Sequence, residues 1–120
     1  MKVTNWINWE QANKKEDAMD GMGGFFNWDR KGMRWKDYIE ACPPEEVPYA
    51  EAIRESMLEK GLYIDGATHQ TCPNGAPVFE DGKAATFSMR GWGDIMAAIW
   101  SEKEDKDYSY MDFYMGVPCQ

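Results

Sequence analysis

A chain of 120 residues is long enough for one domain with one modest hydrophobic core. Its 43% hydrophobic and 14% aromatic residues are typical of a globular protein rather than a disordered one. The 21 acidic and 13 basic residues give a net charge of -8, which argues against free nucleic acid or an anionic membrane as the partner. The charge favours a basic protein partner, although acidity that serves only solubility explains it equally well.

The N-terminal stretch combines a lead-in with the start of a helix. Residues 1–7 fit either a short strand or an irregular segment. Asn8 and Gln11 have the spacing of a capping box, in which Asn8 would cap the first turn. The pattern predicts a short polar helix that runs to about Asp20 and ends at Gly21.

Two further helices are expected before the middle of the chain. The first covers residues 32–42 and ends at Pro43, because proline cannot continue a helix. The second begins near Pro48 and ends before Gly61. Its buried side is expected to carry the apolar residues of the segment, namely Ala50, Ile53, Met57 and Leu58.

The last third predicts a hairpin, a helix and a strand. Residues 78–87 form two apolar arms around Asp81 and Gly82, a pair typical of a two-residue hairpin turn. An amphipathic helix is expected after Ser88, because apolar residues recur at i, i+3, i+4 and i+7, namely Trp92, Ile95, Met96 and Ile99. Residues 108–115 alternate between two sets of side chains, which favours a strand.

Together these elements predict an α+β fold over a single domain, residues 1–120. A small antiparallel sheet, made of the hairpin and the C-terminal strand, would pack against three to four helices. Trp92 and Trp100 are expected in the core. The other tryptophans are too many for so small a core to bury completely, and they are Trp6, Trp9, Trp28 and Trp35.

The acidic residues gather in two places. Glu51, Glu55 and Glu59 recur every fourth residue and would form a row of charges about 6 Å apart along one helix. A second group adds aromatic side chains to acidic ones and consists of Glu102, Glu104, Asp105, Asp107, Tyr108 and Tyr110. Both surfaces suit an arginine- or lysine-rich partner. The alternative is a solvated helix face, which Arg54 and Lys60 would support.

His69 and Cys72 invite a catalytic or a metal hypothesis. A Cys–His pair can activate a thiol nucleophile, and with Cys42 and Cys119 the same residues reach the ligand count of a structural zinc site. Zinc ligands usually come in close pairs, whereas Cys42 and Cys119 are isolated. We therefore expect free thiols, no metal, no cofactor and no catalytic residue.

Two segments of the last third resemble small accessory proteins of bacteriophages and prophages. They are Ser88 to Ala98 (SMRGWGDIMAA) and Tyr110 to Met115 (YMDFYM). The small size, acidity and abundant aromatic residues are also similar to anti-CRISPR and other anti-defence proteins. This resemblance implies binding to a nucleic-acid-handling effector, with a block of guide, target or subunit contacts, and it transfers no functional residue.

The sequence thus predicts a non-catalytic, phage-type inhibitor of a bacterial defence protein or CRISPR effector complex that has a basic surface. We expect it in the host bacterial cytoplasm, since neither a membrane span nor a signal peptide is apparent, with no direct nucleic-acid or membrane contact. The expected binding residues are Glu51, Glu55, Glu59, Glu104, Asp105, Asp107, Tyr108 and Tyr110. Two alternatives stay open: a small enzyme or zinc-stabilised domain that uses His69 and Cys72, and a phage structural or assembly protein. A homodimer is compatible with all three.

Overall fold

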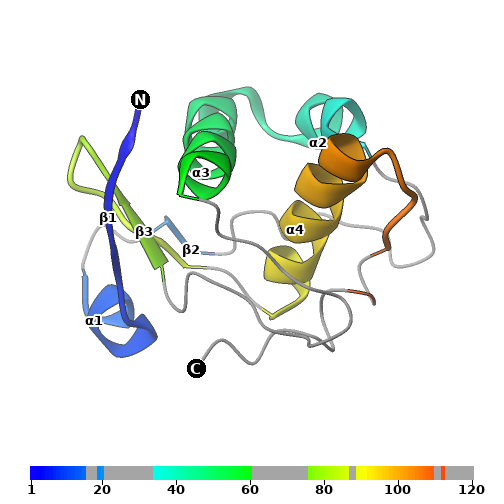
Figure 1. Cartoon of the computed structure of the whole chain (residues 1–120). Coiled ribbons are helices and arrows are strands. Elements are labelled where there is room, and N and C mark those ends of the chain that lie inside the picture. Colours follow the sequence, from blue (N-terminus) through cyan, green and yellow to red (C-terminus); the bar gives the residue numbers. More distant parts are fainter. Residues whose placement is uncertain (16–18, 21–33, 61–75, 87–88, 110–111, 113–120) are drawn as a thin grey trace.

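The computed structural model describes residues 1–15, 19–20, 34–60, 76–86, 89–109 and 112. They contain the strands β1 (Val3–Ile7), β2 (Met19–Asp20), β3 (Ala76–Phe79) and β4 (Ala85–Thr86). The helices are α1 (Trp9–Asn13), α2 (Trp35–Ala41), α3 (Val47–Glu59) and α4 (Met89–Glu104), with a 3-10 turn over Pro44–Glu46. The fold belongs to the α+β class, as the sequence predicts. In Figure 1, α3 lies between the β1–β3 sheet and the pair formed by α2 and α4.

The antiparallel sheet is made by the N-terminal strand. β1 pairs with β3 and places Trp6 opposite Pro77 and Ile7 opposite Ala76. The short strands β2 and β4 form a separate, parallel pair. Residues 1–7, which fitted a strand or a lead-in equally well, therefore supply the partner of β3 in place of the expected C-terminal strand.

The strand predicted over residues 108–115 is not found at the residues described there. The backbone N–H of Tyr108 donates to Ser101 Oγ at 2.9 Å, so it is not available to a strand ladder. The N–H of Ser109 donates to Asp112 Oδ2 at 2.7 Å, as at the start of a helix, and Asp112 is helical. Tyr110, Met111 and residues 113–115 lie outside the described part of the chain.

The hairpin turn is one residue longer than predicted. Gly82 N–H donates to the carbonyl of Phe79 at 2.8 Å, and Phe79 N–H donates to the carbonyl of Lys83, also at 2.8 Å. Gly82 has a φ of +89°, whereas Asp81 does not take a positive φ. A two-residue turn of the expected type needs positive φ at both central residues, so the chain uses a three-residue loop with the glycine last.

The four predicted helices are found, but their bounds differ from the prediction. α2 begins only after Arg34, whose backbone is extended, and α4 continues to Glu104. Asn8 Oδ1 accepts the N–H of Gln11 at 2.8 Å and begins α1, but α1 ends at Asn13 and not near Asp20. The chain beyond it forms β2, which pairs with β4. Pro48 lies in the first turn of α3, where its missing N–H costs nothing.

The core joins α2, α3 and α4 to the sheet. Trp100 and Tyr38 are fully buried at its centre, which confirms the prediction for Trp100; the side chain of Trp92 lies outside the described part. The predicted apolar sides of α3 and α4 are confirmed by the burial of Ala50, Ile53, Met57, Ile95, Met96 and Ile99. Leu58 is only half-buried. Among the described helices, none has the length and apolar character to cross a membrane.

Candidate functional site

The three glutamates of α3 form a row on its solvent side. The opposite side of the helix packs into the core through Ile53 and Met57, which fixes the row outward. Glu51, Glu55 and Glu59 are all exposed. Within the described part of the chain, none of the three makes an ion pair or a side-chain hydrogen bond. We call this row the α3 acidic ridge; its charges are open to a partner.

An open groove of about 760 Å³ runs beside the α3 acidic ridge. Leu58 from α3 and Trp35 from α2 supply its apolar wall, and both are half-buried. The groove therefore places carboxylates next to apolar surface. The described residues that line it are Trp35, Glu51, Arg54, Glu55, Leu58 and Glu59.

Among the described residues, Arg54 is the one basic residue that lines this groove, and it faces an aromatic ring. Its guanidinium carbon lies 5.4 Å from the centroid of the Trp35 ring, a cation–π distance. Trp35 also stacks on Tyr38, with centroids 5.1 Å apart and an interplanar angle of 8°. The Nε of Arg54 is buried and has no hydrogen-bond partner among the described residues. Arg54 thus joins α3 to α2, and no ion pair within the described ranges neutralises the three glutamates.

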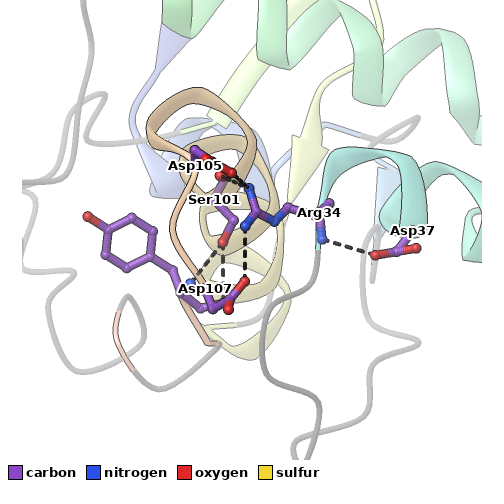
Figure 2. A network of polar contacts seen from close by, with 6 residues as sticks. Arg34, Asp37, Ser101, Asp105 and Asp107 are labelled. Atoms are coloured by element: carbon purple, nitrogen blue, oxygen red, sulfur yellow. Dashed lines mark hydrogen bonds and ion pairs between the residues drawn. The ribbon is translucent and has the colours of Figure 1, made fainter.

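The second acidic group surrounds Arg34 at the start of α2 (Figure 2). Arg34 Nη1 donates to Asp105 Oδ1 at 3.0 Å and to the carbonyl of Ser101 at 2.8 Å, while Nη2 donates to Asp107 Oδ1 at 3.1 Å. Partial burial alone would lower the pKa of Arg34, but the hydrogen bonds and negative charges of Asp105 and Asp107 outweigh it and raise that pKa above its ordinary value. We call Arg34 and its three acceptors the Arg34 clamp. Its carboxylates already have a cation.

The end of α4 orders the same segment from within. Asp105 follows the helix with a φ of 52°, and Lys106 N–H donates to the carbonyl of Ser101 at 3.2 Å, the pattern of a Schellman end. Ser101 is fully buried and accepts the N–H of Tyr108. The Tyr108 hydroxyl donates to Glu104 Oε1 at 2.7 Å. Glu104 and Tyr108 are therefore hydrogen-bonded to each other within the chain.

The structure separates the residues predicted to bind a partner into two sets. Glu51, Glu55 and Glu59 share one exposed face, and sequence reasoning placed them correctly because i+4 spacing on a helix is a local property. The other set, Glu104, Asp105, Asp107 and Tyr108, is engaged within the chain, and Tyr110 lies outside the described part. Sequence reasoning missed Arg34, which meets Asp105 across 71 positions with no local signal.

The thiol and zinc hypotheses find no support in the described residues. Cys42 is buried, and burial, helped by Glu46 and Glu45, raises its pKa to about 11. Such a thiol stays protonated at neutral pH and is a poor nucleophile or metal ligand. Within the described ranges no three His, Cys, Asp or Glu side chains converge on a metal position. His69, Cys72 and Cys119 lie outside those ranges.

Known protein families, curated proteins and solved structures were each compared with the chain, and none matches it. The similarity to phage accessory and anti-defence proteins therefore stays a prediction from the sequence.

Proposed function

We propose that this protein is a non-catalytic inhibitor that binds a basic site on a bacterial nucleic-acid-handling defence protein, such as a CRISPR effector complex. The observation that carries the proposal is the α3 acidic ridge. Its three exposed carboxylates lie in a row and have no partner within the described part of the chain. The Arg34 clamp supports the shape of the molecule and contributes less charge to binding.

Inhibition would be steric competition with nucleic acid or with a subunit. Lysine and arginine side chains donate hydrogen bonds to carboxylates as well as to phosphates, so an acidic ridge can occupy a phosphate-binding groove. Carboxylates about 6 Å apart on a helix are sparser than the phosphates of one DNA strand, which recur about every 3.4 Å. The net charge of -8 would speed encounter with a basic target.

The first test is capture from a bacterial lysate that contains CRISPR and other defence complexes, with washes across a salt series. Bound proteins are identified, and the purified target is assayed for nucleic-acid binding with and without this protein. The double variant Glu51→Lys, Glu55→Lys should weaken capture about tenfold or more, because like charges would then face each other. The matched control is Glu40→Lys, Glu102→Lys, since both residues are exposed and unpaired within the described part.

The outcomes separate clearly. Salt-sensitive capture of a nucleic-acid-binding protein, with inhibition lost in the ridge variant and kept in the control, supports the proposal. Equal capture by the ridge variant and the control contradicts an electrostatic mechanism. Recovery of this protein alone from such a lysate contradicts the inhibitor function.

A further inference from the structure

Two parallel rows of α3 side chains with different chemistry line the groove. One row carries Glu51, Glu55 and Glu59, and the other carries Arg54 and Leu58, which are also four residues apart. Residues four apart form ridges on the surface of a helix, and these ridges pack into the grooves between the ridges of a second helix. We infer that the occupant of this groove is an amphipathic, basic α-helix of the partner protein. The inference rests on the proposed function and adds the form of the segment that is bound.

Charge complementarity sets the first requirement on that helix. Among the lining residues that the structure describes, three carboxylates face a single guanidinium, and Arg54 already lies over the Trp35 ring. Like charges four residues apart on a helix repel each other, so cations that approach the ridge relieve that repulsion. A partner helix meets the ridge best with lysine or arginine at i, i+4 and i+8.

The apolar wall sets the second requirement. Leu58 and Trp35 are half-buried and border the carboxylates directly. A purely polar segment would leave this surface facing polar groups, whereas leucine or a similar residue would cover it. The partner helix therefore needs an apolar row next to its basic row.

Backbone hydrogen bonding favours a helix over an extended peptide. The walls of the groove come from α2 and α3, whose backbone groups bond within their own helices. An extended peptide that adds to a sheet edge gains main-chain hydrogen bonds, whereas the described residues of this groove offer it only side chains. A bound helix brings its own backbone bonds, so none is left unpaired against Leu58 and Trp35.

Three synthetic peptides of about 20 residues test the inference by fluorescence anisotropy with the full-length protein. The first has lysine at i, i+4 and i+8 and leucine at i+3 and i+7 in an alanine-rich helix. The second has the same composition with lysine and leucine at every second position, and the third is the first with a central proline. The first should bind about tenfold more tightly than either of the others.

Two substitutions in the protein assign the contact to the groove. Glu55→Gln and Leu58→Ala should each weaken the first peptide several-fold, because each removes one of the two required chemistries. Glu102→Gln, an exposed position on α4, should leave its affinity unchanged. Circular dichroism of each variant checks that α3 stays folded.

The possible results distinguish this inference from the proposed function. Equal binding of the first two peptides, or tighter binding of the proline peptide, overturns the helical occupant. If the lysate experiment succeeds and its capture depends on the ridge while the first peptide does not bind, the helical occupant is also overturned and the inhibitor function stands. If the first peptide binds and its affinity depends on Glu55 and Leu58, but no nucleic-acid-binding protein is captured, the docking surface is supported and the inhibitor function is contradicted.

Discussion

The α3 acidic ridge and the carboxylates of the Arg34 clamp differ in what each finds within its own chain. Glu51, Glu55 and Glu59 face solvent, and the guanidinium of Arg54, which lines the same groove, lies over an aromatic ring. Asp105 and Asp107 share the guanidinium of Arg34 at 3.0 and 3.1 Å. Acidic residues are therefore not equal as binding groups, and an internal partner decides which charges remain for another molecule.

Position within the helix explains why one group needs a cation and the other does not. The end of α4 carries the negative pole of the helix dipole, so Glu104 and Asp105 are unfavourable there on their own. Arg34 bonds to the Ser101 carbonyl as well as to the aspartates, and thereby offsets both the dipole and the charge. The α3 acidic ridge lies along the side of its helix, where water screens it.

Loss of the Arg34 clamp is the largest effect that we expect. Arg34→Met removes the bonds to Asp105, Asp107 and the Ser101 carbonyl, and leaves the end of α4 with uncompensated negative charge. The Tm, followed by circular dichroism, should fall by several degrees. Lys36→Met is the matched control, because Lys36 is exposed on the same helix and unpaired within the described part. An equal Tm for both variants would show that the Arg34 clamp does not contribute to the stability of the fold.

Ser101→Ala tests the same region without a change of charge. The buried Ser101 hydroxyl accepts the N–H of Tyr108, and its loss leaves that donor without this acceptor. The free energy of unfolding should fall by about 1 kcal/mol in urea titration. Ser109→Ala removes an exposed hydroxyl bond to Asp112 and should change it by less than about 0.5 kcal/mol. The reverse order would contradict the assignment of Ser101 as the residue that holds Tyr108.

Glu55→Gln tests how the α3 acidic ridge affects stability, and this variant should stabilise the protein, unlike the two before it. Glu55 has a like charge four residues away on each side, so its neutralisation should stabilise the protein by about 0.5 kcal/mol. Asp107→Asn removes the same charge from a paired carboxylate and should not stabilise. Urea titration of both variants at low salt measures the difference. A shift of the same sign in both would remove the distinction between the two groups.

The smallest change in stability is expected at Asp81, which lies outside both acidic groups and has a neutral hydrogen-bond partner. The Tyr49 hydroxyl donates to Asp81 Oδ2 at 2.6 Å and holds the pKa of Asp81 below its ordinary value. A lowered folded-state pKa gives stability that is present above the unfolded pKa of about 3.9 and is lost as the pH falls through the folded value. Tyr49→Phe should therefore be less stable than wild type at neutral pH and equal to it at strongly acidic pH. A constant difference across that range would contradict the linkage.

Sequence reasoning succeeded where structure is local. The apolar stripe of α4 and the position of Pro48 in α3 are set by residues within a few turns, so both helices were predicted. The α3 acidic ridge follows from the same periodicity. The N-terminal strand was only one of two interpretations, because its partner β3 lies some 70 positions later.

Several failures come from contacts that the pattern of neighbouring residues does not reveal. The sequence over residues 108–115 alternates like a strand, but the hydroxyl of Ser101 accepts the backbone N–H of Tyr108, which a strand ladder would use. Asp105 and Asp107 form an acidic cluster in sequence, yet Arg34 neutralises them in space. The groove depends on Trp35 and Leu58 from two helices, and no local pattern brings them together.

The Arg34 clamp also has a consequence for how this protein can diverge. One guanidinium holds carboxylates 71 and 73 positions away, so loss of Arg34 leaves both carboxylates without this cation, and loss of both aspartates leaves the guanidinium without these acceptors. Related sequences should therefore lose or keep Arg34, Asp105 and Asp107 together, as residues in contact do. Positions 51, 55 and 59 have no such tie within the described part of the chain, and their variation would follow the surface of whatever they bind.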